Sequence, residues 1–195
     1  YIKHTYHSLL IIYKSTISNF YSQKIHLLDL LSAVNLGDDS ASRLVRVPVC
    51  YHEKFAPDLK VFEQQKQLQP NALINLHTSK IYRVFFIGFL PGFPYLSNVD
   101  QSLKLDRKSK PRPKILAGSV GIAGLQTGIY PVDSPGGWQI IGQTPLRLFD
   151  SASQQSFLKA GDRIQFKPIG LNEFEEIKAN LLNNNNFQNQ FIDES

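Results

Sequence analysis

The sequence predicts an α+β chain that is mainly β, with a short strand and helix followed by a closed or nearly closed β-barrel. Between Gly88 and Gly142, nine of the chain's twelve glycines and six of its eleven prolines separate short runs of β-prone residues. Many short strands joined by tight turns are typical of small barrels, and not of helical or doubly wound domains. Helical periodicity is confined to short stretches outside this window.

The first 42 residues predict one strand and one helix. Residues 8–13 are apolar and β-prone, and Ser18-Asn19 is a helix-start signal. Apolar residues then recur at three-residue steps up to Val34, and Gly37 is expected to end the helix. Residues 38–42 form a polar linker. One strand and one helix cannot bury the helix's apolar face alone, so we expect residues 1–42 to be part of a small α/β domain. The chain has no methionine, and it is expected to begin partway into a longer protein.

The main domain is expected over residues 43–180, followed by a polar tail over 181–195. Alternation over 43–51 predicts a strand, in which Pro48 favours an edge position or the strand's beginning. Residues 81–89 carry apolar side chains on both parities, which predicts a strand buried on both faces. The asparagine run 183–186 is of low complexity, so the tail is expected to be disordered. Helices are expected over 57–67, 71–77 and 172–182, a turn over 160–162, and further strands over 114–116, 119–122, 139–141, 146–150 and 163–168.

Composition excludes several classes of protein. No run of eighteen apolar residues occurs, which argues against a membrane span. The single cysteine, Cys50, excludes a disulfide framework and a thiolate metal cluster, and a cytoplasmic location fits. Its place in an alternating run favours a buried small hydrophobe over a nucleophile. We expect no metal site, because the histidines show no metal-ligand spacing; they stand at positions 4, 7, 26, 52 and 77.

A basic cluster lies between Lys104 and Lys114, where six lysines and arginines are opposed only by Asp106. Such a cluster can be a solvated loop, or it can bind a small anion or an acidic partner surface. We do not expect nucleic-acid binding, since Pro111 and Pro113 interrupt the cluster and no aromatic residues are interleaved for base stacking.

The glycine-rich window also carries the candidate site residues. Residues 88–96 form a loop with three large aromatic rings, which either fold back into the core or line a pocket or an interface with another subunit. Residues 117–124 resemble an anion-binding loop, although they match no known phosphate-binding motif. For Trp138, the only tryptophan, a core position is favoured over a stacking platform.

Three titratable residues are candidate acids or bases. His77, at the end of a predicted helix, could point into the barrel mouth as an acid or base, or it could simply be satisfied at the helix C-terminus. Asp106 and Asp133 lie beside turns, where a capping or solvated role is favoured over a catalytic one. No catalytic set can be assembled by spacing, and no GxSxG elbow is present.

Several long motifs resemble those of one bacterial family. They are GFLPGFPYL, the PRPK segment, AGSVGIAGLQTGIYPVDSPGGWQIIGQTPLRLFD and AGDRIQFKPI. The chain is similar over residues 6–178 to the family that contains the B subunit of 5-oxoprolinase, the sporulation-kinase inhibitor KipI and allophanate hydrolase subunit 1. The resemblance implies a cyclophilin-like β-barrel preceded by part of a small α/β, ferredoxin-like domain.

The resemblance also implies a function. The favoured one is the small B subunit of an ATP-dependent 5-oxoprolinase, which opens 5-oxoproline to glutamate together with a larger C subunit and an A subunit. ATP would be bound by the complex, because this chain lacks a nucleotide-binding motif. The alternatives are an inhibitor of a sensor histidine kinase, or a protein related to the subunits of allophanate hydrolase and urea carboxylase.

In this hypothesis the barrel presents a pocket for a small cyclic substrate. His77 is the candidate proton carrier, and Arg112 is the candidate to pair with a carboxylate or phosphate. The other candidate binding residues are Phe89, Phe93, Tyr95, Gly118, Ser119, Val120, Gly121, Gln126, Thr127 and Trp138.

Overall fold

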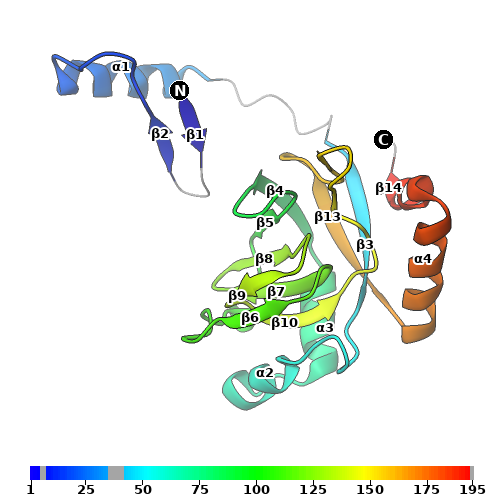
Figure 1. Cartoon of the computed structure of the whole chain (residues 1–195). Helices are drawn as coiled ribbons and strands as arrows, with labels where there is room; N and C mark the ends of the chain where they lie inside the picture. Colours follow the sequence, from blue (N-terminus) through cyan, green and yellow to red (C-terminus); the bar gives the residue numbers. More distant parts are fainter. Residues whose placement is uncertain (5–7, 35–41, 194–195) are drawn as a thin grey trace. The chain divides into compact units, whose positions relative to one another are not determined.

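The computed structural model describes residues 1–4, 8–34 and 42–193 and divides the chain into two compact units, Tyr1–Ala41 and Ser42–Ser195 (Figure 1). The expected helix stop at Gly37 and most of the expected linker lie outside the described residues.

The N-terminal unit contains a hairpin and a helix. Strand β1 (Ile2–His4) pairs antiparallel with β2 (Leu9–Ile11), which is the strand expected over residues 8–13. Helix α1 (Phe20–Ser32) begins where the sequence predicts, because the Asn19 side chain accepts a hydrogen bond of 3.1 Å from the Ser22 amide. No residue of α1 is buried, and Leu28 and Leu31 are among its exposed apolar side chains.

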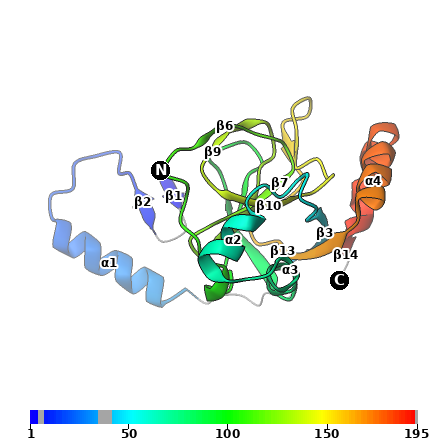
Figure 2. The same ribbon diagram turned by 90° about the horizontal axis from the view of Figure 1, so that it is seen from below.

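The second unit is built on a closed barrel, which confirms the expected fold class. Within the described part of the chain, seven strands follow the order β10-β7-β8-β5-β4-β13-β3, and β10 pairs with β3 to close the ring (Figure 2). Of these pairings only β13 with β3 is parallel. The strands are β3 (Leu44–Cys50), β4 (Ile81–Ile87), β5 (Pro94–Ser97), β7 (Ser119–Ala123), β8 (Gln126–Ile129), β10 (Gln139–Gln143) and β13 (Arg163–Ile169).

Closure of the ring depends on a close approach at Gly142. The closing pair is Gln143 with Cys50, and a Cβ on Gly142 would lie 2.7 Å from Val49 Cγ1. Only glycine leaves room for β3 at this distance. Pro48 lies where β3 is bonded to β13 on one side, while β14 and β10 reach the other side only at the two ends of β3. Its missing amide proton is therefore tolerated, as an edge position predicts.

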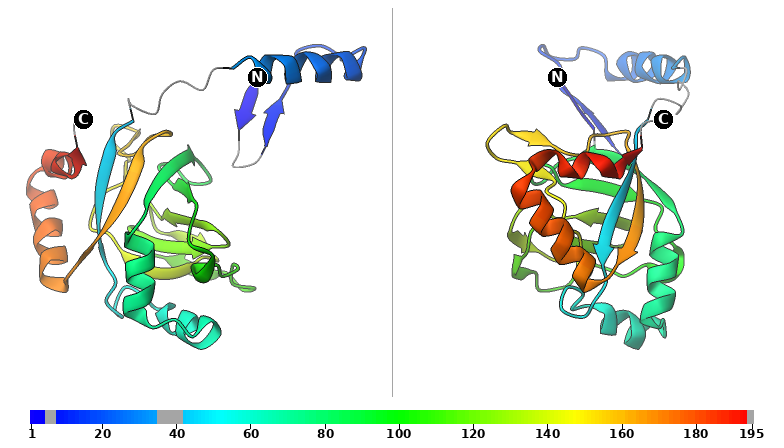
Figure 3. Two further views of the ribbon diagram at one scale, coloured as in Figure 1. Left: turned by 180° about the vertical axis from the view of Figure 1, so that it is seen from behind. Right: turned by 90° about the vertical axis from the view of Figure 1, so that its right-hand side faces the viewer.

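Short elements cover the barrel. Helices α2 (Leu59–Lys66) and α3 (Pro70–Thr78) lie together at one end, and α4 (Leu171–Asn183) runs alongside β3 (Figure 3). A two-stranded ribbon of β6 (Arg112–Ile115) and β9 (Ser134–Gly136) lies outside the main sheet. Strand β11 (Phe149–Asp150) pairs with β12 (Gln155–Ser156), and η2 (Gln101–Leu103) is a single turn.

Two expectations about burial and order are wrong. Strand β4 alternates, with Tyr82 and Val84 buried while Ile81 and Phe85 are exposed, because a closed barrel has an outer surface as well as a core. Residues 181–193 are not a disordered tail: α4 continues to Asn183, η3 (Asn185–Phe191) follows, and β14 (Ile192–Asp193) pairs with β3. The Asn184 side chain accepts from the Asn186 amide, so an asparagine of the run begins a new turn.

Candidate functional site

His77 lies in the interior of the barrel and not at its mouth. It ends α3 with 0% exposure, and its ring stacks on Phe166 with 4.4 Å between centroids. Its Nδ1 lies 2.7 Å from the Tyr51 hydroxyl, and its Nε2 lies 3.0 Å from Thr127 Oγ1. The structure therefore brings together two of the predicted site residues, His77 and Thr127, and adds Tyr51.

The hydrogen bonds fix which group donates and which accepts among Tyr51, His77 and Thr127. Thr127 donates its only hydroxyl proton to the Gly121 carbonyl at 3.0 Å, so Thr127 must accept from His77 Nε2–H. Nδ1 is then the acceptor, and Tyr51 donates to it. Burial lowers the pKa of His77 to about 3 and raises that of Tyr51 well above its usual value. This geometry holds His77 as a neutral, fully bonded imidazole that water does not reach.

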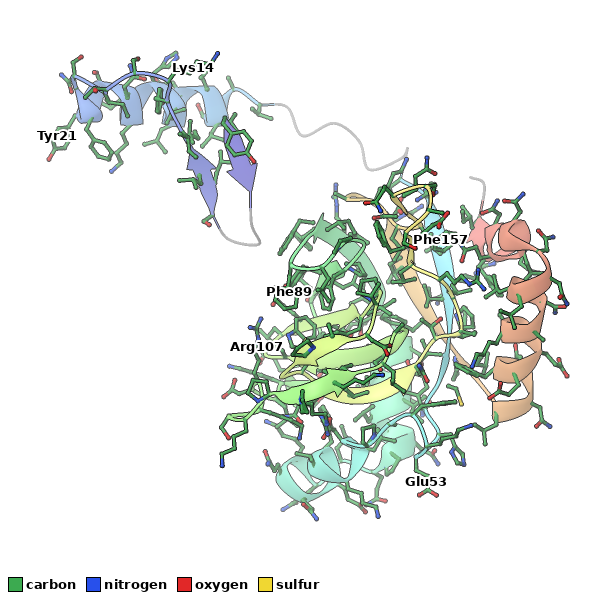
Figure 4. All side chains as sticks on the ribbon, viewed as in Figure 1. Lys14, Tyr21, Glu53, Phe89, Arg107 and Phe157 are labelled. Atoms are coloured by element: carbon green, nitrogen blue, oxygen red, sulfur yellow. The ribbon has the colours of Figure 1, made fainter. Side chains whose placement is uncertain are left out.

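Two aromatic residues of the segment 88–96, Phe93 and the β5 residue Tyr95, form a layer with Trp138 on the outer face of the barrel. Phe93 contacts Trp138, with 5.3 Å between centroids, and Tyr95, at 4.7 Å. Phe93 and Trp138 are buried, in agreement with the favoured core position of Trp138, and Tyr95 is half-buried. Phe89 is different: it is 73% exposed and projects from the barrel surface (Figure 4).

Glycines beneath this layer make room for its rings. Gly121 and Gly128 face each other on β7 and β8. A Cβ on Gly128 would lie 2.9 Å from the Phe93 ring, and one on Gly121 would lie 3.1 Å from Trp138 Cβ. The absence of side chains therefore lets the rings pack directly on the sheet. At these two positions the structure explains the glycines by ring packing.

The backbone donors expected around Gly118 are already used. The Gly118 amide donates to the Tyr130 carbonyl at 2.7 Å, and the Ser119 amide donates to Leu116 at 3.1 Å. Val120 and Gly121 lie inside β7, which is bonded to strands on both sides. The resemblance to an anion-binding loop is therefore not accompanied by free amides at Gly118 or Ser119.

The two remaining polar candidates are Gln126 and Asp133. Gln126 is half-buried at the start of β8, and strand alternation places its side chain on the opposite face from Thr127. Asp133 accepts from the Ala117 amide at 2.8 Å and pairs with Lys114 at 2.9 Å, which is a capping role.

Arg112 is held by a buried carboxylate that the sequence did not single out as a site residue. Asp58, 1% exposed, accepts two hydrogen bonds of 2.8 Å from the Arg112 guanidinium and pairs with Lys108 Nζ at 2.9 Å. It also accepts from the Ile140 amide at 2.6 Å. Burial alone would raise the pKa of Asp58, but the hydrogen bonds from Arg112, Lys108 and Ile140 outweigh it and the pKa is lowered. Arg112 therefore has its planar fork engaged within the protein.

A groove of about 870 Å³ opens beside this carboxylate. We call it the basic groove, because its charged lining consists of Lys66, Lys104, Asp106, Arg107, Lys108 and Lys110. The guanidinium carbon of Arg107 lies 5.8 Å from the centre of the Trp138 ring, which connects the groove to the aromatic layer. Among the residues that the structure describes, no group of three His, Cys, Asp or Glu residues could hold a metal ion.

The contacts that sequence reasoning missed are long-range. Asp58 is 54 residues from Arg112 and 82 from Ile140, and Tyr51 is 26 from His77. Pro57-Asp58 indicates only a helix start, and nothing local marks that aspartate as a centre of charge. One signal could have indicated a buried carboxylate, namely the high density of lysines and arginines between residues 104 and 112. A partly buried cation needs a negatively charged partner.

Comparison with known proteins identifies the family. A family model described as "Carboxyltransferase domain, subdomain C and D" matches residues 1–159, well over half of the chain. The chain belongs to this family. Three of its relatives are named as the B subunit of 5-oxoprolinase and are 44 to 47% identical to it. The one from Bacillus subtilis (strain 168) is 47% identical over 137 residues, which make up 70% of this chain and 57% of that protein.

The chain spans less than two thirds of the length of each of these three relatives, from 57% to 63%. A solved structure of a conserved uncharacterized protein from Pyrococcus horikoshii is 40% identical, with a TM-score of 0.65, and the match covers 89% of this chain and 80% of that one.

The fold of this carboxyltransferase-family chain also occurs in the Kluyveromyces lactis urea carboxylase. That structure matches 90% of this chain and 18% of its own, with a TM-score of 0.59 and 18% identity, which shows likeness of fold alone. In the part of the chain that the structure describes, no helix is long and apolar enough to cross a membrane.

Proposed function

We propose that this chain is part of the B subunit of an ATP-dependent 5-oxoprolinase, which opens 5-oxoproline to glutamate together with a larger C subunit and an A subunit. The observation that carries the proposal is the identity of 44 to 47%, over 128 to 137 residues, with three relatives that bear the name of this 5-oxoprolinase component. A cytoplasmic location belongs to the same proposal and agrees with a single, buried cysteine.

The geometry supports a role that depends on partners. His77 is buried and neutral, Arg112 is bound to Asp58, and the amides of Gly118 and Ser119 are bonded to neighbouring carbonyls. None of these groups is free to meet a substrate in this conformation. The exposed positive charge of the basic groove suits a component that supplies a binding surface while the complex supplies ATP and the reacting groups.

The test is reconstitution. The protein that contains this chain is co-expressed with its candidate A and C subunits, and 5-oxoproline-dependent ATP hydrolysis and glutamate formation are measured together. We expect both activities with all three components and neither when this chain is omitted. The three Bacillus subtilis components serve as the positive control for the assay.

Two results would contradict the proposal. The first is background activity with all three folded components present, under conditions in which the Bacillus subtilis complex is active. The second is background activity accompanied by inhibition of the autophosphorylation of a sensor histidine kinase, which would assign the chain to the regulatory alternative instead.

A further inference from the structure

The chain's excess positive charge is concentrated at one place. The net charge of the whole chain is +5. The basic groove and the adjoining Asp58 cluster hold six cationic side chains, including Arg112, against two carboxylates, Asp58 and Asp106. The difference, four positive charges, accounts for most of the excess. A solvated loop with no ligand would not require so much like charge to gather around one concave surface.

Several of these charges are available to a ligand. Lys108 and Arg112 pair with Asp58, and Arg107 lies over Trp138. Among the described residues, Lys66, Lys104 and Lys110 form no ion pair, and all three are exposed. Even at Asp58, two cations face one carboxylate, so the cluster itself retains a positive charge.

The backbone beneath the groove is held in place by the barrel. The Lys108 amide donates to the Gly137 carbonyl at 2.7 Å, and the buried Gln139 side chain donates from Nε2 to the Asp106 carbonyl at 2.9 Å. At the start of the segment, the Gly124 amide donates to the Leu105 carbonyl at 2.7 Å. Three anchors within residues 105–108 fix the loop, so binding a ligand would cost little entropy for ordering it.

We infer that the basic groove binds a polyphosphate group, meaning two or more linked phosphates of one small ligand. Lysines act as compact point charges on flexible stems, and several of them together suit a multiply charged anion. A single carboxylate is best held by a free bidentate arginine, whereas here the Arg112 fork is occupied by Asp58 and the Arg107 guanidinium lies over the Trp138 ring. The inference concerns the groove of this chain alone, and its test does not require the reaction proposed above.

Single-stranded nucleic acid fits this surface less well. Its binding relies on exposed aromatic faces on which bases stack. Trp138, whose ring contacts Arg107 of the groove, is only 4% exposed and is packed against Phe93. The groove therefore offers positive charge without a stacking platform.

Titration calorimetry of the whole chain at about 0.15 M salt, near physiological ionic strength, tests the inference with pyrophosphate and tripolyphosphate as probes. We expect saturable one-to-one binding that is tighter for tripolyphosphate. The groove variant is the double substitution Lys104→Gln and Lys110→Gln. Its charge-matched control is Lys159→Gln and Lys167→Gln, two exposed lysines outside the groove lining. Each charge removed at about 4 Å should weaken binding roughly fivefold, so the groove variant should lose about 25-fold and the control almost nothing.

Several outcomes would overturn the inference. They are an absence of saturation with wild-type protein, equal weakening in the groove and control variants, or tripolyphosphate binding no tighter than pyrophosphate. Tighter binding of a charge-matched oligonucleotide or acidic peptide would assign the groove to a macromolecular partner instead. All four substituted lysines are exposed, and circular dichroism confirms that each variant is folded before titration.

Discussion

Replacing Asp58 by alanine removes the carboxylate that connects three parts of the second unit. Asp58 precedes α2 and holds Arg112 of β6, Lys108 of the basic groove and the Ile140 amide of β10. Removing one partner of a buried ion pair costs about 3–5 kcal/mol, mainly because the remaining charge is left uncompensated. Here Arg112 and Lys108 are 28% and 24% exposed and can regain some water. The buried Ile140 amide is left without its carboxylate acceptor, which costs about 1–3 kcal/mol.

We therefore expect Asp58→Ala to lower the free energy of unfolding by about 3–4 kcal/mol. Asp58→Asn keeps an oxygen acceptor for the Ile140 amide and should lose about 2 kcal/mol. The measurement is urea unfolding at pH 7, followed by fluorescence of Trp138. Because Trp138 is the only tryptophan and lies in the second unit, its signal reports on the barrel and not on residues 1–34.

Asp133→Ala is the matched control. Asp133 also accepts from a backbone amide and pairs with a lysine, but its side chain is 47% exposed and that of Lys114 is 65% exposed. Its loss should cost at most about 1 kcal/mol. If Asp58→Ala costs no more than this control, the Asp58 cluster does not stabilise the barrel and the reasoning is refuted.

The pH dependence provides a second check on Asp58. Its pKa is lowered in the folded protein from an ordinary value of 3.8. The stability it contributes is therefore fully present above about pH 4 and is lost as the pH falls through the folded pKa. The difference between wild type and Asp58→Asn should shrink below about pH 4, and a difference that stays constant down to pH 2 would contradict the assignment.

Three further predictions concern the barrel interior and the aromatic layer. Thr127→Val removes the acceptor of His77 Nε2–H and should cost about 1–3 kcal/mol in urea unfolding, whereas Thr127→Ser, which keeps the hydroxyl, should cost less. The pKa of His77 is about 3 in the folded protein and 6.5 in the unfolded chain, so the unfolded state binds the proton first as the pH falls. The free energy of unfolding should therefore decrease below pH 6.5, by about 2 kcal/mol at pH 5. A flat profile, or an imidazolium signal for His77 in nitrogen NMR at pH 5, would contradict this. Gly128→Ala places a Cβ 2.9 Å from the Phe93 ring and should lower the free energy of unfolding by about 1–3 kcal/mol. The control is Gly170→Ala, where the added Cβ meets nothing within 4 Å and the loss should be under about 1 kcal/mol. Similar losses in both variants would refute the packing role.

Local signals in the sequence predicted most of the elements. Asn19 begins α1 through its side chain, Pro70 occupies the first turn of α3, and Gly161 lies in the turn before β13 with a φ of +92°. Each signal acts within a few residues, so one sequence is enough to detect it. The density of glycine and proline predicted the barrel for the same reason. Each tight turn between two strands needs such residues locally, so many of them indicate many short strands.

The candidate site was harder to predict because it depends on which strands meet. Thr127 reaches His77 only after β8 has paired with β5 in one register, and a shift of one residue would turn Thr127 to the outer face. Gly121 stood out only as part of a glycine-rich loop, and the structure shows that Gly121 and Gly128 leave space for rings contributed by residues 93 and 138. The sequence shows that a glycine leaves space, but only the folded structure shows whether a ring or a ligand occupies that space.

The arrangement of polar groups decides where chemistry can occur in the second unit. Inside the barrel, the side chains of Tyr51, His77 and Thr127 are buried and hydrogen-bond to one another, and Thr127 also donates to the Gly121 carbonyl. Outside the barrel interior, Asp58 pairs with the partly buried Lys108 and Arg112, while the other lysines of the basic groove are exposed to water. A ligand or partner bound at the basic groove would therefore meet a positively charged surface, and any proton transfer in a reaction there must be supplied by a group other than His77.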